Sequence, residues 1–248
     1  MKRTIAIGDI HGGLKALVQL FERIELTQDD FLIFLGDYVD GWSDSANVIG
    51  YLIELANQNT CVFLRGNHDD LTHHWLKTGD VNEQWLMHGG QTSIDAYRKL
   101  SSEEIETHIG FYEKMKNYYI DEQNRLFVHA GFTNLRGPEE EYFPSLFFWD
   151  RTLWEMVLSL DKTLPPAHKF YPVRLQLFEE IFIGHTPVTR IDESKPVKMA
   201  NVWNLDTGAA FKGKLSAMDI NSNKIWQSEP VHKLYPKEKG RNLESFLP

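Results

Sequence analysis

The sequence predicts a mixed α/β fold, and three observations lead to this prediction. Over residues 3–64, short apolar stretches alternate with longer stretches in which apolar residues recur at helical spacing. After residue 125, five further short stretches have the apolar character of strands. The composition, with 42% hydrophobic and 25% charged residues, is that of a folded globular protein and excludes a disordered or collagen-like chain.

The first third of the chain alternates strand and helix. The first helix is indicated by a repeat of Leu14, Leu17, Val18, Phe21 and Ile24. We expect strands at residues 3–7, 31–35 and 61–64, with helices at 14–24 and 46–55. Short apolar strands linked by helices are typical of a parallel sheet with right-handed crossovers.

The remainder of the chain is predicted to be helical first and then richer in strands. Residues 69–117 are polar with helical spacing, which predicts a cap-like insertion. Strands are expected at 126–128, 181–183, 202–205, 215–219 and 224–226. Residues 221–223, Asn-Ser-Asn, predict a hairpin between the last two strands. Strand directions in this half should therefore be mixed.

The chain shows no repeat, low-complexity tract or Gly/Ser linker, so residues 1–248 are interpreted as one domain. A tail from about 230 to 248 carries basic residues and prolines among few apolar ones, which predicts surface packing or disorder.

The charge and the cysteine content of the chain indicate which kinds of partner and which cellular location to expect. The chain has 26 Lys and Arg against 35 Asp and Glu, a net charge of −9, which disfavours binding of extended nucleic acid. No stretch approaches the ~18 apolar residues of a membrane helix, and the apolar stretch behind Met1 is too short for a signal peptide. Cys61 is the single cysteine and has no internal disulfide partner. These features predict a cytoplasmic protein without a membrane partner.

Polar motifs follow the predicted strands at the points where the strands end. The first three strands lead into Gly-Asp-Ile-His-Gly (8–12), Gly-Asp-Tyr-Val-Asp (36–40) and Gly-Asn-His-Asp (66–69). Two later strands lead into His-Ala-Gly (129–131) and Gly-His-Thr-Pro (184–187). Because the carboxyl ends of parallel strands share one edge of a sheet, these motifs should converge on a common site.

The motifs supply six candidate metal ligands, which are Asp9, His11, Asp37, Asn67, His129 and His185. Carboxylate, imidazole and amide groups without a thiolate suit ions such as Mn, Fe or Zn and disfavour a structural zinc site. Any one of these residues alone is better explained as a loop aspartate that satisfies backbone donors or as a buried, hydrogen-bonded histidine. The agreement of five motifs favours a dinuclear metal site.

In their order and spacing, these motifs resemble the motif series of the calcineurin-like metallophosphoesterases. The nearest branch is the bacterial phosphoprotein phosphatase type, which includes serine/threonine phosphatases and symmetrical diadenosine tetraphosphate hydrolases. The resemblance extends from Gly8 to His185, and residues 204–209 resemble the final strands of the family. It implies a central β-sandwich flanked by helices, with the metal site at one rim and residues 69–117 helping to build the substrate wall.

The resemblance also implies how the ligands are shared. One metal is expected on Asp9, His11 and Asp37, and a second on Asp37, Asn67, His129 and His185. Two divalent ions about 3.5 to 4 Å apart, most simply manganese, would generate a hydroxide nucleophile and clamp the phosphoryl oxygens. No protein nucleophile is then needed, and Cys61 is expected to be a core residue.

His68 resembles the family's general acid, which protonates the leaving oxygen. Asp40 is its expected partner, because a carboxylate beside the imidazole orients it and favours its protonated form. The alternative interpretation makes His68 a helix-start residue and Asp40 a turn former.

The chain departs from the family at one position. Many members carry an arginine directly after the residue equivalent to Asp40, but here Gly41 follows. Arg151 is the predicted substitute for binding phosphate, against the alternative of a surface salt bridge. Arg65 matches a family residue that binds substrate or simply anchors loops. Loss of one guanidinium would weaken phosphomonoester binding or make room for a larger substrate.

Two further features lie in or near the predicted cap. His88-Gly89-Gly90 stands where bacterial members often carry Asn-Gly-Gly and is predicted to be structural or a cap contact. The tryptophans at 75, 85, 149 and 154 can stack a base or a tyrosine ring, although core or cap packing is the commoner use.

The function predicted from these residues is metal-dependent phosphoester hydrolysis of the serine/threonine phosphatase type, acting on a phosphorylated protein or a small phosphoester. The close alternative is symmetrical hydrolysis of a dinucleoside polyphosphate. A metal-binding scaffold without turnover is a third possibility, against which the retention of His68 and Asp40 argues. Nucleic-acid phosphodiesterase activity is disfavoured by the acidic balance.

Overall fold

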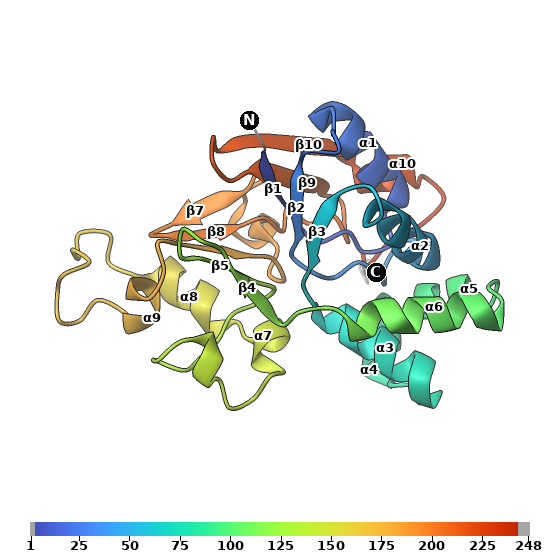
Figure 1. Ribbon diagram of the computed structural model, residues 1–248, viewed down its shortest axis with the longest axis horizontal. Helices are drawn as coiled ribbons and strands as arrows, with labels where there is room; N and C mark the ends of the chain where they lie inside the picture. Colours follow the sequence, from blue (N-terminus) through green and yellow to red (C-terminus); the bar gives the residue numbers. More distant parts are fainter. Residues whose placement is uncertain (1–2, 243–248) are drawn as a thin grey trace, which may run out of the picture.

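The structure, a computed structural model, describes residues 3–242 of the chain. Two five-stranded sheets pack against each other, and helices lie on their outer faces (Figure 1). The predicted mixed α/β fold with a central β-sandwich flanked by helices is confirmed.

The first sheet has the order β10-β9-β1-β2-β3. Its strands are β1 (Thr4–Ile7), β2 (Phe31–Phe34), β3 (Thr60–Phe63), β9 (Lys214–Asp219) and β10 (Lys224–Pro230). The first three are parallel, as predicted, and are linked by α1 (Leu14–Ile24) and α2 (Ser45–Leu55). β9 runs antiparallel to β1 and forms the predicted hairpin with β10.

The second sheet has the order β4-β5-β6-β8-β7. Its strands are β4 (Tyr118–Ile120), β5 (Arg125–Val128), β6 (Glu180–Ile183), β7 (Val197–Met199) and β8 (Val202–Asn204). β5, β6 and β8 are parallel, whereas the edge strands β4 and β7 are antiparallel to their neighbours. The sequence did not predict the three-residue edge strands β4 and β7, whereas the equally short β8 was predicted because its apolar pattern continues to Leu205.

Helices lie on both sides of the sandwich (Figure 1). On the side of α1 and α2 lie α3 (Asn67–Thr78), α4 (Glu83–Trp85), a kinked turn (Leu86–Gly90), α5 (Gln91–Tyr97) and α6 (Ser102–Glu113). These elements correspond to the helical pattern at residues 69–117. On the other side lie the short α7 (Leu146–Trp149), α8 (Thr152–Ser159) and α9 (Val173–Gln176), which the sequence did not predict.

The strands divide their apolar side chains between three clusters. Ile5 and Ile7 of β1 face the cluster under α1 and α2, whereas Ala6 faces the interior between the two sheets. The interior also contains Phe127 of β5 and Phe182 of β6, whose rings stack 4.8 Å apart. Because both faces of the inner strands are covered, strands such as β1 and β2 are almost entirely apolar.

The C-terminal segment, which the sequence predicted to pack on the surface or to be disordered, packs against the rest of the molecule up to residue 242. Short helix α10 (Val231–Leu234) follows β10, and both Val231 and Tyr235 are buried. The Tyr235 ring stacks on Trp42 with 5.3 Å between centroids, and its hydroxyl donates to Asp44 Oδ2 at 2.7 Å. The segment up to residue 242 therefore packs into the core, and residues 243–248 of the predicted tail lie outside the described part of the chain.

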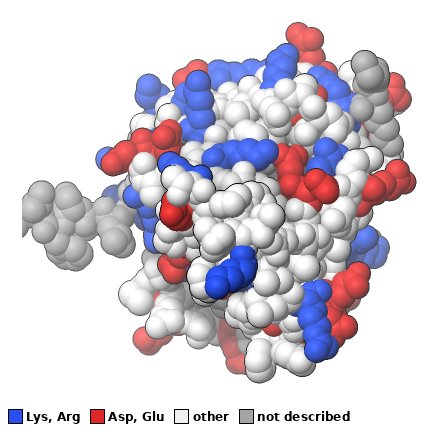
Figure 2. All heavy atoms as spheres, turned by 90° about the vertical axis from the view of Figure 1, so that its left-hand side faces the viewer, with Lys and Arg blue, Asp and Glu red and all other residues white. Residues whose placement is uncertain are grey.

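Within residues 3–242, no helix is long and apolar enough to cross a membrane. Figure 2 shows basic and acidic side chains interspersed around broad uncharged areas on one face of the molecule. A long nucleic-acid backbone favours a continuous basic band instead, and the visible charge pattern of this face does not have that form.

Candidate metal centre and phosphate pocket

The carboxyl ends of five strands and the loops that follow them place the predicted ligands at one rim of the sandwich. Asp9 and His11 follow β1, Asp37 follows β2, Asn67 begins α3 after β3, His129 follows β5 and His185 follows β6. All six side chains are buried. The parallel order of β1, β2 and β3 in one sheet and of β5 and β6 in the other explains this convergence.

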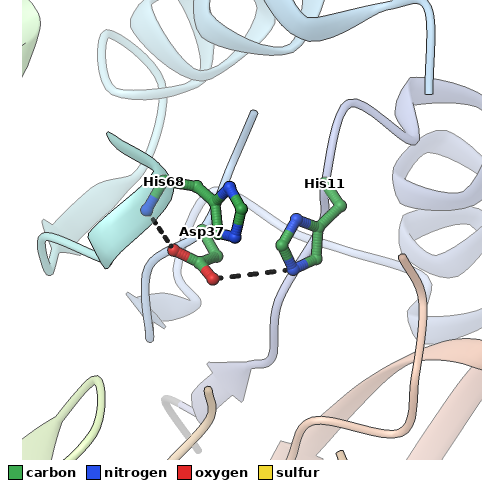
Figure 3. Close-up of side chains that lie close together, drawn as sticks. All are labelled: His11, Asp37 and His68. Carbon is green, nitrogen blue, oxygen red and sulfur yellow. Dashed lines mark hydrogen bonds and ion pairs between the residues drawn. The ribbon is translucent and has the colours of Figure 1, made fainter. Parts of the chain in front are cut away.

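The first group of ligand atoms surrounds His11. Its Nε2 lies 3.5 Å from Asp37 Oδ2 (Figure 3). The same atom lies 4.0 Å from Asp9 Oδ2. Its Nδ1 lies 3.0 Å from the carbonyl oxygen of Asp40. Because a carbonyl can only accept, Nδ1 carries the proton and the neutral ring presents the Nε2 lone pair to the site, as in metal-binding histidines.

A second group surrounds the other side of Asp37. His129 Nε2 lies 3.5 Å from Asp37 Oδ2 and 3.3 Å from Asn67 Oδ1. His129 Nδ1 donates to the carbonyl of Leu35 at 2.7 Å, which again leaves Nε2 facing the site. His185 Nδ1 lies 2.9 Å from Asn67 Oδ1. Asp37 belongs to both groups, which is the position expected for a bridging carboxylate.

These residues fit a pair of divalent cations. Asp9 Oδ1 and His185 Nε2 are buried and have no hydrogen-bond partner in the described part of the chain. Burial and the neighbouring carboxylate of Asp206 raise the pKa of Asp9 well above its ordinary value. Buried carboxylates that destabilise one another's charge are relieved by a bound cation. Oxygen and nitrogen donors without thiolate suit a first-row divalent ion.

The electrostatics of the site concentrate on Asp37. Burial opposes its ionisation, but the imidazoles of His129 and His68 outweigh burial and hold its pKa well below the ordinary value. Burial also opposes the charged form of His129, yet Asp37 raises the pKa of His129 to about 10. Burial lowers the pKa of His11 and His185 well below the ordinary value. Metal binding at this site would displace the proton held by His129.

The same loops contain four non-glycine residues in left-handed backbone conformations. His11, Asp37, Asp40 and His185 all have positive φ angles, between 52° and 68°. Such conformations are uncommon for residues with a Cβ and persist where the surroundings impose them, often at functional sites. Gly36 has φ 102°, and a Cβ there would lie 2.8 Å from His129 Nδ1, so only glycine lets these two loops approach.

Asp69 supports the ligand loops, although the sequence analysis did not assign it to the site. Its carboxylate accepts from the backbone N–H groups of Gly66, Asp37 and Tyr38 at 2.7 to 2.9 Å. It thus joins the loop after β2 to the start of α3. Its place in the Gly-Asn-His-Asp motif was visible in the sequence, but its partners were not.

His68 contacts Asp37 through its backbone, whereas its side chain pairs with Asp40. The backbone N–H of His68 donates to Asp37 Oδ1 at 3.0 Å (Figure 3), while its Nδ1 pairs with Asp40 Oδ2 at 2.7 Å. His68 also stands close enough to His11 and Asp37 to complete a possible metal triad. Its engagement with Asp40 instead leaves Nε2 as the free ring atom.

Asp40 is held by donors that the sequence analysis did not find. Trp85 Nε1 donates to Asp40 Oδ2 at 2.6 Å, and the Ser93 hydroxyl donates to Oδ1. Asp40 is fully buried, so these bonds fix the carboxylate and through it the His68 ring. Nothing in the spacing signals these contacts, because they span 45 and 53 residues.

Replacing Ser93 by alanine should therefore disturb the orientation of His68 while leaving the metal ligands in place. We expect a loss of about tenfold in turnover, the usual worth of a hydrogen bond to a charged group. The loss should be larger for a poor leaving group than for nitrophenyl phosphate. Ser228→Ala is the matched control, because Ser228 is also buried but bonds to Leu215 and Glu229. Equal losses on both substrates would contradict this positioning role.

A pocket of about 290 Å³ adjoins the ligand cluster. It is lined by Asn67, His68, Leu71, Asn82, Gln84, Trp85, His88, Trp149, Arg151, Arg190 and Arg241. The structure places Arg151 in this pocket, where it donates to Thr186 Oγ1 at 3.1 Å. Burial and the nearby charge of Arg190 lower the pKa of Arg151. Arg190 and Arg241 were not predicted, since they lie in a turn and in the expected tail.

Arg65 does not line this pocket, in contrast to the predicted substrate contact. Its guanidinium donates to Asp70 Oδ1 and to the carbonyl of Tyr112, both at 2.9 Å. Arg65 therefore joins α3 to the end of α6. These contacts fit the alternative interpretation, in which Arg65 anchors loops and does not bind substrate.

The tryptophans separate into different environments. Trp149 is 45% exposed, lines the pocket, and its ring lies 6.4 Å from that of His185. Trp154 is buried in the core under α8, and Trp75 packs against Trp85. Trp149 is thus the exposed aromatic surface at the pocket, and Trp85 serves mainly to hold Asp40.

Two overlapping groups of buried nitrogen and oxygen ligands beside an arginine-lined pocket, at the rim of a helix-flanked β-sandwich, define a metal-dependent hydrolase of phosphoric esters. Residues 2–209 match the family model described as calcineurin-like phosphoesterase, and the chain belongs to this family. Members of this family use a dinuclear site of divalent metal ions, which agrees with the two overlapping groups.

Curated relatives and solved structures agree with this assignment. A protein of Oceanobacillus iheyensis named bis(5'-nucleosyl)-tetraphosphatase PrpE [asymmetrical] is 26% identical over 226 residues, covering 85% of this chain and 86% of the relative. The protein of the same name from Bacillus mycoides is 28% identical over 233 residues, covering 86% and 88%.

Two solved structures show the same fold at low sequence identity. A putative diadenosine tetraphosphatase has a TM-score of 0.62 and 21% identity, with 91% of this chain and 92% of that chain covered. A protein serine/threonine phosphatase from Saccharomyces cerevisiae has a TM-score of 0.60 and 14% identity, with coverage of 92% and 80%.

Proposed function

We propose that this phosphoesterase hydrolyses dinucleoside tetraphosphates, cleaving them asymmetrically into a nucleoside monophosphate and a nucleoside triphosphate. The observation that carries the proposal is the group of three arginines in the pocket beside the ligand cluster. The names of the curated relatives support the same substrate and the same direction of cleavage. The proposal departs from the symmetrical cleavage that the sequence analysis considered.

The charge of the pocket favours a polyphosphate over a single phosphoryl group. None of Arg151, Arg190 and Arg241 has a carboxylate within 4.0 Å in residues 3–242. Three unpaired guanidinium groups are unusual in a chain with a net charge of −9. Guanidinium binds phosphate oxygens with paired hydrogen bonds, so three of them match several phosphoryl groups in a row. The exposed face of Trp149 is available for a base.

The residue roles follow the site geometry. We propose that Asp9, His11 and Asp37 hold one cation and that Asp37, Asn67, His129 and His185 hold the other, with manganese the proposed ion. Two divalent cations bound there would supply a nucleophile from water at neutral pH and positive charge against the phosphoryl oxygens. His68 delivers a proton from Nε2 to the leaving oxygen, and Asp40 orients the ring through Nδ1. Arg151 and its neighbours hold the phosphate oxygens in line.

A serine/threonine phosphatase-type activity is the second candidate, because one observation favours it. The His68–Asp40 pair is buried, and Trp85 and Ser93 donate hydrogen bonds to Asp40. A general acid oriented in this way matters most when the leaving group is a poor one. A serine alkoxide needs a proton, whereas a nucleotide phosphate leaves more easily. A phosphorylated protein therefore remains the alternative substrate.

Two wider proposals accompany this function. We propose that the chain acts as one domain in which α3–α6 form the substrate wall. The pocket residues Asn82, Trp85 and His88, which come from this helical region, support that role. We keep the cytoplasm as the proposed location, on the grounds of the single cysteine Cys61 and a nucleotide substrate.

A substrate panel tests the proposed function. After metal removal, the protein is reloaded with Mn, Ni, Zn or Mg and assayed with diadenosine tetraphosphate, a phosphoserine peptide, nitrophenyl phosphate and a cyclic nucleotide. We expect kcat/KM for diadenosine tetraphosphate to exceed that for the peptide by about 10²-fold, since the extra phosphates add charge-assisted contacts. The products should be AMP and ATP.

Each other outcome contradicts a stated part of the proposal. Two molecules of ADP would establish symmetrical cleavage. A higher kcat/KM for the phosphoserine peptide would favour the second candidate. Preference for the cyclic nucleotide would indicate a phosphodiesterase.

A further inference from the structure

Arg241 reaches the pocket from the far end of the chain, and the segment before it is anchored along its length. Tyr235 stacks on Trp42, and the Glu238 carboxylate accepts from the backbone N–H and the hydroxyl of Ser43 at 2.9 and 2.7 Å. The backbone N–H of Arg241 donates to the carbonyl of Ala210 at 2.8 Å. The segment thus lies along the loop that begins at Asp40, and its position is set by several independent contacts.

The aliphatic part of Arg241 occupies a narrow space between two glycines. A Cβ at Gly41 would lie 3.4 Å from Arg241 Cγ, and a Cβ at Gly89 would lie 3.2 Å from the same atom. Both glycines have positive φ angles, 124° and 104°, so side chains there would be strained as well as crowded. Gly41 is the residue directly after Asp40, where the sequence lacks the arginine found in many family members. Arg241 therefore passes beside the position at which a guanidinium is missing.

The charged end of Arg241 is committed to no other group. Its Nε is buried and has no hydrogen-bond partner in residues 3–242, and no carboxylate pairs with it there. The guanidinium carbon lies 5.4 Å from the centre of the Phe211 ring, which supports one face. Burial and then the charge of Arg241 lower the pKa of His88 on the pocket wall. Arg241 is half-buried, and the buried N–H at its Nε lacks an acceptor, which is costly for a cation; an anionic ligand at the guanidinium would reduce that cost.

We propose that Arg241 is a substrate-binding residue that supplies, from the C-terminal segment, the phosphate-binding guanidinium absent at Gly41. It would bind phosphoryl oxygens on the side of the pocket next to the His68–Asp40 pair, together with Arg151. The proposal rests on the proposed function only in assuming that the substrate carries a phosphoryl group. Side chains at Gly41 and Gly89 would crowd the backbone of His11 and Gly41 first and the Arg241 side chain next, so both glycines are compatible with the path of the arginine.

The test compares Arg241→Met with Lys237→Met in the full, metal-loaded protein. Methionine keeps an unbranched side chain between the glycines and removes the charge. Lys237 is an exposed residue of the same segment outside the pocket, so its variant controls for charge and for the substitution itself. Binding of inorganic phosphate is measured by calorimetry with and without metal, and as competitive inhibition of nitrophenyl phosphate hydrolysis. Metal content and melting temperature are recorded for both variants.

We expect Arg241→Met to weaken phosphate binding by about tenfold or more and to raise KM for nitrophenyl phosphate, with metal content unchanged. Arg241→Lys should bind phosphate with intermediate affinity, because it keeps the charge without the planar pair of donors. Arg241→Ala should recover part of the lost activity when guanidinium is added at a concentration too low to unfold the protein. Lys237→Met should behave as the unmodified protein.

Phosphate affinity in Arg241→Met equal to that of the unmodified protein would overturn the proposal. An equal loss in both would also overturn it, since it would show a general effect of charge. A loss confined to Arg241→Met supports the proposal even if the unmodified protein does not cleave diadenosine tetraphosphate. That combination would reject the proposed substrate and retain the role of Arg241.

Discussion

Asp37→Asn is expected to lose bound metal and activity together. Asp37 Oδ2 lies 3.5 Å from both His11 Nε2 and His129 Nε2, so one carboxylate serves both groups of ligands. A neutral amide lacks the negative charge of a carboxylate that bridges two cations. We expect turnover to fall by about 10³-fold or more, because activation of the water depends on both cations. Metal content by elemental analysis and turnover on nitrophenyl phosphate are measured on the same preparations.

The control for this prediction is Asp219→Asn. Asp219 is also buried and accepts from the backbone of Asn221 and from Ser222, but it lies outside the ligand cluster. That variant should keep two metals and full turnover. Two metals bound tightly in Asp37→Asn would show that Asp37 does not bridge, and turnover that persisted after complete chelation of the unmodified protein would reject the metal mechanism.

His68→Ala is expected to retain its metals and to lose ~10²- to 10⁴-fold in turnover, the usual range for a general acid. The reason is geometric, because Nδ1 of His68 is engaged by Asp40 at 2.7 Å and only Nε2 is free for a leaving group. The loss should depend on the leaving group, since nitrophenolate departs with little help and a serine alkoxide needs the proton. We would measure turnover on nitrophenyl phosphate and on a phosphoserine peptide.

His74→Ala is the matched control for this prediction, because His74 stands on the same helix with 61% of its side chain exposed. It should leave both activities unchanged. Asp40→Asn should follow the pattern of His68→Ala in milder form, because it removes the partner and not the acid. Loss of metal in His68→Ala would instead assign His68 to the triad with His11 and Asp37.

The order of strands and ligands could be predicted from the sequence because it depends on local patterns. An apolar strand followed by glycine and a polar residue is readable within ten residues, and parallel pairing brings such strand ends together. This is why Asp9, Asp37 and His185 were found without any knowledge of their contacts. The short elements β4, β7 and α7–α9 gave no such signal and were missed.

The partners of the site residues were decided by the tertiary structure. Asp40 is held by Trp85 and Ser93 through bonds across 45 and 53 residues, and no spacing rule connects such positions. Arg65 fits the family motif, but its guanidinium donates to Asp70 and to the carbonyl of Tyr112 and does not line the pocket.

The C-terminal segment shows the same limit most clearly. By composition it resembles a solvent-exposed tail, because composition counts charges without locating them. In the structure, Tyr235 packs on Trp42 and the chain continues past Gly240 to Arg241 in the pocket. The sequence by itself determined the candidate metal ligands, since each belongs to a polar motif at the end of a strand. Only the tertiary structure decided that Arg190 and Arg241 line the pocket beside Arg151, because their positions depend on contacts between segments that are far apart in the chain.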